Sequence, residues 1–251
     1  MSLNLFSVAT LLFLGLALGS FGSVIVARVP QGRGIGGRSV SPCCKKKIAA
    51  RDLIPLASYA LLRGRCRVCH RRIALRYPLL EAFSAALVAL PSLHEGYIDS
   101  YTLATGVALW LFLLLAALDA ESQHISDAVT LPFLVFALFA AYLRGYVHWL
   151  GPLLGGGFFS LQWVLSRGRV LGSGDIFMGI AMGLLLDSWQ ETLLGIALSY
   201  SIGAAIVSVL LVTGRAKRTD RIAFIPYVFA GTLVAYLGGA PLLSVLAPWA
   251  Y

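Results

Sequence analysis

Hydrophobic residues occur in long runs in which nearly every position is apolar, and polar positions do not recur at the spacing of an amphipathic helix or strand. Residues 111–118 form one such run. Backbone polar groups in lipid must be paired within the segment itself, which favours helices. Strands of a membrane barrel alternate between apolar and polar residues over about ten positions. The pattern therefore predicts an all-α, polytopic membrane protein.

About eight transmembrane helices are expected, several of them shorter than the ~20 residues of a straight crossing. The predicted spans are 1–27, 78–93, 101–118, 128–143, 149–165, 176–186, 192–212 and 223–247. The span at 176–186 is the shortest, and we expect it to be broken or to continue past its charged ends. The chain is thus divided into a first helix at 1–27, a polar loop at 28–77 and a membrane-embedded remainder at 78–251.

Composition agrees with this pattern, since 59% of the 251 residues are hydrophobic and 12% are charged. Soluble domains are about 45–50% apolar and about 25% charged. A soluble enzyme, a disordered protein and a collagen-like fibre are excluded. No Lys or Arg precedes Arg28, so residues 1–27 lack the basic start of a secretory signal. They are interpreted as a membrane helix with its N-terminus outside.

The formal net charge of +9 is concentrated in one loop. Residues 28–77 hold 13 of the 20 Lys and Arg residues and a single acid, Asp52. If that loop is cytoplasmic, the connections on its side hold 19 basic residues and the other side holds only Arg144. This split follows the positive-inside rule. The loop has no basic–aromatic interleaving, so contact with anionic lipid is expected and nucleic acid is not.

Asp119 ends the predicted third span and Asp175 begins the sixth, so both are expected at the cytoplasmic boundary of the membrane. Carboxylates there are costly to keep charged and tend to be functional or paired. Two carboxylates brought together share a proton and titrate as a coupled pair. In an aspartic protease one of them accepts a proton from water and the other polarises the scissile carbonyl. Such chemistry needs no cofactor.

The sequence around each acid offers further candidates. Gly172 and Gly174 precede Asp175 and would let an extended substrate approach the backbone. The alternative is a glycine-rich helix N-terminus capped by Ser173 or Asp175.

Two more acids, Glu121 and Asp127, follow Asp119 in the stretch LDAESQHISDAVTLP. Asp127 is expected to cap the next helix. His124, between them, is expected to be a solvated loop residue.

All four cysteines, Cys43, Cys44, Cys66 and Cys69, lie in the basic loop. CRVC at 66–69 has the spacing of a metal knuckle, and four thiolates could bind Zn²⁺ tetrahedrally. Adjacent cysteines rarely chelate one ion without strain, which makes His70 a candidate fourth ligand. A degenerate, empty knuckle and a redox pair are the alternatives.

These features together resemble the bacterial prepilin peptidase family, the type IV leader peptidases of pilus and type II secretion systems. The similar stretches are GSFGSVIVARVP, IPLASYALLRGRCRVCHRRIALRYPLLEAF, LDAESQHISDAVTLP, GSGDIFMG and RIAFIPYVFAG. The resemblance implies a GxGD-type intramembrane aspartyl protease whose catalytic pair is Asp119 and Asp175. It places the protein in the bacterial inner membrane with the active site on the cytoplasmic side. Contacts with substrate are expected from Gly172, Gly174, Glu121, Asp127 and Pro226.

The resemblance also implies partners and cofactors. The substrates would be type IV prepilins or pseudopilins, cleaved after a Gly that precedes the mature N-terminus. Many family members then N-methylate that terminus with S-adenosylmethionine, and the cysteines form a zinc-binding loop associated with the N-terminal part.

Three stretches depart from the family pattern. SPCC at 41–44 replaces CPxC, so that Ser41 stands at the first ligand position and Cys43 lies out of place. ISD at 125–127 replaces Leu-Pro-Asp, and AFIP at 223–226 replaces Pro-Phe-Gly-Pro. None of these changes alters the two catalytic acids.

Two other classes of function fit parts of the sequence. A secondary transporter also uses intramembrane carboxylates and glycine-broken helices. It would place its acids near the bilayer midplane, whereas Asp119 and Asp175 are expected at one face. A non-catalytic scaffold of a secretion machine would not require the two aspartates to lie within reach of each other.

Overall fold

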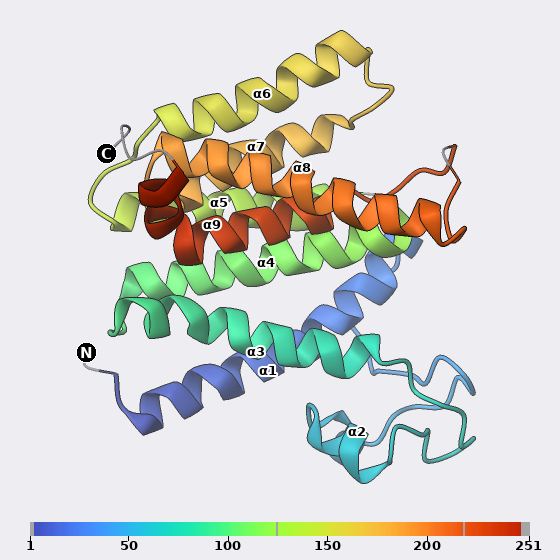
Figure 1. Ribbon diagram of the computed structural model, residues 1–251. Helices are drawn as coiled ribbons and strands as arrows, with labels where there is room; N and C mark the ends of the chain where they lie inside the picture. The colour runs from blue at the N-terminus through green and yellow to red at the C-terminus, as the bar shows by residue number, and fades with distance from the viewer. Residues whose placement is uncertain (1–2, 124, 218, 247–251) are drawn as a thin grey trace. The chain divides into compact units, whose positions relative to one another are not determined.

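The computed structural model describes residues 3–123, 125–217 and 219–246, and within these the protein is mainly helical and forms no β-strand (Figure 1). In chain order the elements are α1 (Leu5–Arg28), η1 (Val29–Gln31), η2 (Ala50–Leu53), α2 (Ala57–Leu61), α3 (Arg76–Glu95), α4 (Ser100–Ser122), α5 (Asp127–Leu143), α6 (Leu150–Ser166), α7 (Ser173–Leu185), α8 (Trp189–Val212) and α9 (Ile225–Leu246). The all-α prediction is confirmed.

Each predicted span coincides with one of the longer helices. Within the described part of the chain, four of them are long and apolar enough to cross a membrane: Leu5–Gln31, Ser100–Ser122, Trp189–Val212 and Ile225–Val245. The apolar helices α5 and α7 are shorter than this. The count of eight spans therefore stays a prediction, and the expected end of the last span at residue 247 lies outside the described residues.

The chain forms two compact units, Met1–Trp110 and Leu111–Tyr251, and the boundary between them falls within α4. In the first unit α1 packs along α3. The connection between these two helices carries η1, η2, α2 and all four cysteines. The first unit therefore holds a helical hairpin together with the basic loop.

In the second unit α7 is the central helix and contacts α5, α6, α8 and α9. Met178, Ala181 and Met182 on it are completely buried. Its 13 residues correspond to about 20 Å, less than the ~30 Å of the hydrocarbon layer. A helix this short is stabilised by the longer helices around it rather than by lipid.

Glycines let α6 and α7 approach closely. A Cβ atom added to Gly155 of α6 would collide with the backbone of Gly179 of α7. Gly157 of α6 does not face α7 in this way, because a Cβ atom there would meet no atom within 4 Å. The pairing of the two helices therefore depends on one face of α6, and it fixes the position of α7.

Aromatic contacts join three further helices of this unit. The ring of Phe112 on α4 lies 4.7 Å from that of Phe133 on α5 and 5.4 Å from that of Phe229 on α9. Phe112 and Phe133 are fully buried. This packing holds the end of α4 beside the start of α9, where the candidate site lies.

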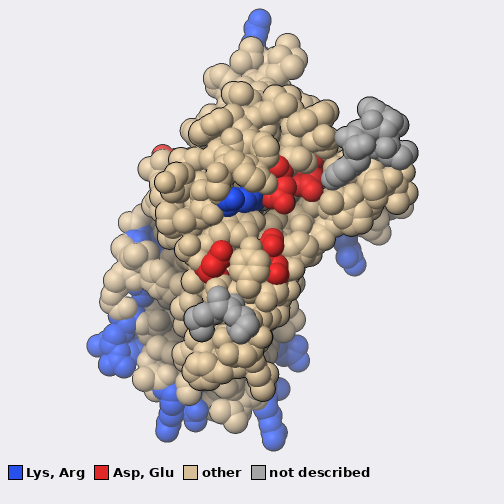
Figure 2. Space-filling view, turned by 90° about the vertical axis from the view of Figure 1, so that its left-hand side faces the viewer, with Lys and Arg blue, Asp and Glu red and all other residues tan. Residues whose placement is uncertain are grey.

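Arg144, the one basic residue predicted to lie outside, is fixed at the far end of α7. Its guanidinium lies 2.8 Å from the Asp187 carboxylate. It also donates hydrogen bonds to the carbonyls of Leu185 and Leu186, at 3.0 and 3.2 Å. Figure 2 shows a face of the molecule on which acidic side chains lie directly beside a basic one.

Candidate active site

Asp119 lies near the end of α4 and is buried, with 8% of its surface exposed. Its Oδ2 atom accepts a hydrogen bond of 2.9 Å from the N–H of Ile225, the first residue of α9, and the backbone of Phe224 bonds to it as well. Backbone N–H groups at a helix start have no partner within the helix and attract a negative charge. The carboxylate of Asp119 thus joins α4 to the start of α9.

Asp175 is the third residue of α7 and is also buried. Its Oδ2 atom accepts a 2.9 Å hydrogen bond from the N–H of Gly172, the residue before the helix. The alternative interpretation of this motif, a helix start capped by Asp175, therefore describes its local structure. Capping does not exclude catalysis, because the bond uses only one of the two carboxylate oxygens.

The two acids come together in the second unit although 55 residues separate them in the chain. The negative charge of Asp119 acts on Asp175. Asp119 is held at the start of α9 and Asp175 at the start of α7, and these two helices are in contact. Both acids therefore lie at the starts of neighbouring helices, as a catalytic pair requires and a non-catalytic scaffold does not.

Gly174 is needed for the close approach of the segment that follows α4. A Cβ atom on it would collide with the side chain of Ile125. Gly172 has no such neighbour, since a Cβ there would lie 3.7 Å from its nearest atom, an oxygen of Asp175. Gly172 is exposed next to the acid, whereas Gly174 is required by packing.

An aromatic cluster that the sequence analysis did not identify lies beside the acids. Phe224, adjacent to the residue that binds Asp119, has its ring 5.2 Å from Tyr200 of α8 and 6.0 Å from Phe159 of α6. The Tyr200 hydroxyl donates a 2.7 Å hydrogen bond to Gln162 of α6. The signal available in the sequence was a Gln and a Tyr within apolar runs, because polar groups in membrane helices are usually paired.

The other expected substrate residues differ in accessibility. Glu121 in the last turn of α4 and Asp127 at the start of α5 are exposed. Pro226 is the second residue of α9 and is half-buried. The prediction that Asp127 caps α5 is wrong by one residue: Ser126 occupies the cap position and Asp127 is the first helical residue. His124 lies outside the described residues.

The four cysteines meet in the first unit. The Sγ atoms of Cys43, Cys44, Cys66 and Cys69 all lie within 4.8 Å of one another. His70, the candidate alternative ligand, is not part of this cluster. Four converging thiols fit the tetrahedral Cys₄ arrangement of a structural zinc site.

Two hairpins of the same construction carry these thiols. In one, the N–H of Ser41 donates to the carbonyl of Lys46 and the N–H of Lys45 donates to Ser41. In the other, Cys66 takes the place of Ser41, with Arg71 and His70 as its partners. Ser41 therefore occupies the position of a knuckle ligand, as its register suggested.

Cys43 supplies the thiol that this position lacks. Its Sγ lies 3.1 Å from the hydroxyl of Ser41 and 2.6 Å from the Sγ of Cys69. The Ser41 hydroxyl lowers the pKa of the Cys66 thiol to about 6, and the contact with Cys43 raises that of Cys69 to about 12. Without metal, protons are thus distributed unevenly among the thiols, and a bound cation would displace them.

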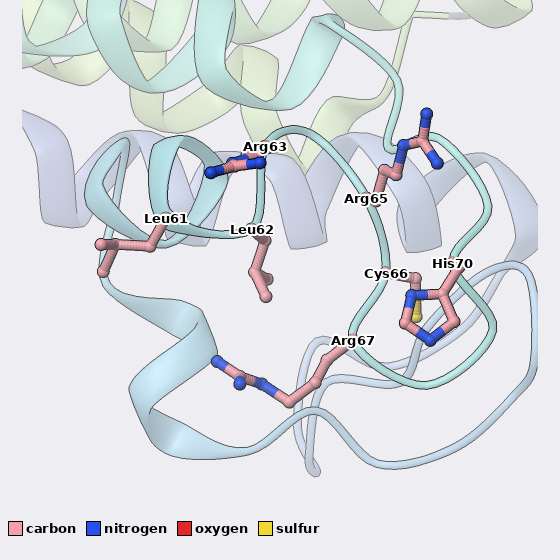
Figure 3. Close-up of a pocket in the computed structure, with 7 residues that line it drawn as sticks. All are labelled: Leu61, Leu62, Arg63, Arg65, Cys66, Arg67 and His70. Atoms are coloured by element: carbon pink, nitrogen blue, oxygen red, sulfur yellow. The ribbon is translucent and has the colours of Figure 1, made fainter.

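A cavity of 640 Å³ adjoins this cluster, as Figure 3 shows. Its lining consists of Leu61, Leu62, Arg63, Arg65, Cys66, Arg67 and His70. Arg67 is held by Asp52 through hydrogen bonds of 2.7 to 3.1 Å, and its guanidinium keeps the pKa of that carboxyl below its usual range. The lining is strongly basic and open to anions.

Both units match known protein families. Residues 13–94 match the bacterial peptidase A24 N-terminal domain, and residues 106–208 match the type IV leader peptidase family. The first match covers the cysteine hairpins and the second covers both candidate catalytic acids.

Relatives resemble most of the chain. Proteins named prepilin leader peptidase/N-methyltransferase are 38% identical over 198 residues in Klebsiella pneumoniae (70% of this chain, 83% of that protein) and 30% identical over 241 residues in Bacillus subtilis (93% and 95%). The protein of that name from Myxococcus xanthus is 34% identical over 223 residues (84% and 65%). No solved structure is significantly similar. With both of its units matched, the chain belongs to the type IV leader peptidase family.

Proposed function

We propose that Asp119 and Asp175 form the catalytic pair of a peptidase that removes the leader of type IV prepilins or pseudopilins. The observation that carries this proposal is two buried carboxylates with interacting charges, each hydrogen-bonded through one oxygen to the N–H at a helix start. These bonds orient both side chains, and the bond to Gly172 leaves the other oxygen of Asp175 for water and substrate. The names of the relatives support the choice of substrate.

The mechanism needs one ionised and one protonated carboxylate. The ionised acid accepts a proton from a water molecule as that water attacks the scissile carbonyl, while the protonated acid donates to the carbonyl oxygen. A proton then passes to the departing amine, which becomes the new N-terminus. Exclusion of bulk water around the buried pair strengthens each of these electrostatic interactions.

The substrate would lie against the exposed residues near the pair. Gly172 leaves room for an extended chain, and Pro226 stands at the start of α9 beside Asp119. Glu121 and Asp127 attract the basic leader, since both are exposed acids close in sequence to Asp119. The basic cavity in the first unit would repel that leader.

The first unit would bind zinc and take part in methylation. Cys43, Cys44, Cys66 and Cys69 would hold Zn²⁺, which would stabilise the loop. S-adenosylmethionine would supply the methyl group, because the relatives are named N-methyltransferases as well as peptidases. The arginine-lined cavity, with Leu61 exposed beside it, would face anionic lipid headgroups.

The proposed setting is the bacterial inner membrane, with the N-terminus outside and the active site on the cytoplasmic side. This orientation follows from the placement of 19 of the 20 basic residues on one side of the predicted spans. The prepilin leader would then be cleaved before the pilin leaves the membrane.

The test is incubation of the purified, detergent-solubilised protein with a prepilin and labelled S-adenosylmethionine, scoring cleavage and methylation separately. Asp119→Asn and Asp175→Asn should each lower cleavage at least ~100-fold, the effect typical of general acid–base groups. Asp99→Asn, at the start of α4, is the control and should cleave normally, because the amide oxygen can still accept the bond from Thr102. Retained cleavage in either active-site variant would refute the proposed pair.

A further inference from the structure

The first unit contains a carboxylate that peptide cleavage does not use. Glu81 lies in the second turn of α3, half-buried against α1. A Cβ atom added to Gly19 of α1 would lie only 2.6 Å from the Cα of Glu81. The close approach of the two helices therefore places this acid at their interface.

Two groups from other segments bind this carboxylate. The N–H of Leu56 donates a 2.8 Å hydrogen bond to Oε2 of Glu81, and the side chain of Ser20 on α1 also hydrogen-bonds to it. Leu56 has a φ of +57°, a conformation that a bulky residue rarely adopts. A carboxylate can accept about four hydrogen bonds, so these two donors leave capacity for a cationic ligand.

No other acid of the first unit combines a place beside the cysteine loop with free capacity for a cationic ligand. Its four acids are Asp52, Glu81, Glu95 and Asp99. Asp52 is engaged by Arg67, and Asp99 binds the N–H of Thr102 at the start of α4. Glu95 stands at the opposite end of α3, about 20 Å away at 1.5 Å per residue. Glu81 is therefore the acid at the end of α3 that joins the cysteine loop.

N-methylation requires such a group. The α-amino group has a pKa of about 8, so the new N-terminus is largely an ammonium and must lose a proton to react. The nitrogen lone pair then attacks the methyl carbon of the sulfonium donor. The carbon–sulfur bond breaks, its electron pair stays on sulfur as a thioether, and the product is a secondary ammonium. The proton that the α-ammonium gives up before the attack must go to a base.

Resting on the proposed methylation, we propose that Glu81 binds the new α-amino group and accepts its proton. The acids of the second unit have the separate task of activating water. The charge distribution predicts that the loop at 28–77 and Asp119 lie on one side of the membrane. The end of α3 that carries Glu81 would then face the side on which the amine is released.

A purely structural role for Glu81 makes a different prediction. If the carboxylate only holds Leu56 in place, then Glu81→Gln is tolerated, because the amide oxygen still accepts that N–H. If Glu81 binds an ammonium and takes a proton, Glu81→Gln loses both functions, because the neutral amide neither attracts the cation nor accepts its proton. Glu81→Gln is therefore the discriminating variant, and Glu95→Gln on the same helix is its control.

The experiment uses the full-length protein in detergent with prepilin and labelled S-adenosylmethionine. We expect Glu81→Gln to cleave prepilin and to methylate the product at least ~100-fold more slowly than wild type, while Glu95→Gln methylates normally. Binding is measured with two mature pilin peptides, one with a free N-terminus and one acetylated. Wild type should prefer the free amine, and Glu81→Gln should lose that preference while keeping its melting temperature.

The outcomes separate this inference from the function on which it rests. Methylation by Glu81→Gln near the wild-type rate, or an unchanged preference for the free amine, would overturn the role of Glu81 alone. Wild-type protein that cleaves without methylating would overturn both the methylation and this role, and would leave the peptidase proposal intact. If Asp119→Asn or Asp175→Asn still cleaves prepilin, the peptidase proposal itself fails.

Discussion

At the scale of residues, the candidate catalytic acids differ in what holds them. Asp175 binds the N–H of Gly172 three positions before it, whereas Asp119 binds the N–H of Ile225, 106 positions after it. Both bonds use Oδ2 and both donors stand at a helix start. The pair is therefore oriented by backbone groups, which cannot be removed by mutation of a neighbouring side chain.

The pH dependence of cleavage should report the pair rather than one acid. Hydrolysis needs one carboxylate ionised and the other protonated, so cleavage should fall at low pH, where both are protonated, and at high pH, where both are ionised. We expect a bell-shaped profile of kcat/KM against pH whose two limbs belong to the coupled pair. A profile that stays flat from acid to alkaline pH would contradict the dyad.

Part of this site was accessible from the sequence. Asp119 and Asp175 stand at the ends of apolar runs, where carboxylates are rare, and glycines mark the second of them. The aromatic cluster of Tyr200, Phe224 and Phe159 was not predicted, because it depends on the packing of three helices. The grouping of all four cysteines was predicted, whereas the contact of Cys43 with Cys69 was not, since it depends on how the two hairpins face each other.

The proposed zinc binding by the cysteine cluster can be tested by moving one thiol from position 43 to position 41. Cys43→Ser should lose zinc, because only three thiolates remain. Adding Ser41→Cys to that variant should restore about one zinc ion per chain, since position 41 is the counterpart of position 66 in the second hairpin. Zinc is measured by mass spectrometry of the purified protein. Full zinc content in the single variant would show that Cys43 is not a ligand.

At the scale of elements, the short helix α7 shows one of the two outcomes expected for its span, namely that it continues past a charged end. The apolar run suggested a span at 176–186, whereas α7 begins at Ser173 and includes the buried Asp175. The helix starts earlier because the carboxylate satisfies an N–H at its own N-terminus. The longer spans were predicted within a few residues, since continuous apolar runs largely determine where they begin and end.

The α6–α7 contact provides a test within one helix. Gly155→Ala should lower the stability by about 1–3 kcal/mol, since the added methyl meets the backbone of α7, which cannot move aside easily. Gly157→Ala should be neutral or stabilising, because its methyl meets nothing and alanine favours the helix. Thermal unfolding in detergent measures both. Equal melting temperatures for the two variants would mean that the close contact is absent in solution.

At the scale of the whole molecule, the connections between helices are of two kinds: those predicted to be cytoplasmic, which hold 19 basic residues, and those predicted to lie outside, which hold one. Arg144 is the exception to the predicted cytoplasmic excess, and it is neutralised by Asp187 and bonded to the carbonyls that end α7. The contacts of Arg144 thus give it a structural role in the folded protein, separate from any effect on orientation.

Labelling of thiols tests this orientation directly, because the four native cysteines all lie in the loop at 28–77. In intact spheroplasts, a membrane-impermeant maleimide should label the thiol introduced by His148→Cys and should spare the native ones. After permeabilisation and removal of metal by a chelator, the native thiols should react too. Peptide mapping identifies the labelled sites, and reaction of the native cysteines before permeabilisation would reverse the proposed topology.

The bond between Asp119 and Ile225 has a practical consequence for capturing the enzyme with an uncleaved precursor. Deleting the side chain at position 119 would inactivate the protein and would also release the first turn of α9. If that variant then failed to bind the precursor, the loss of the acid and the loss of local structure could not be told apart. Asparagine preserves an oxygen for that N–H while removing the ability to exchange a proton. Asp119→Asn is therefore the form in which an intact precursor can be trapped on an undistorted scaffold.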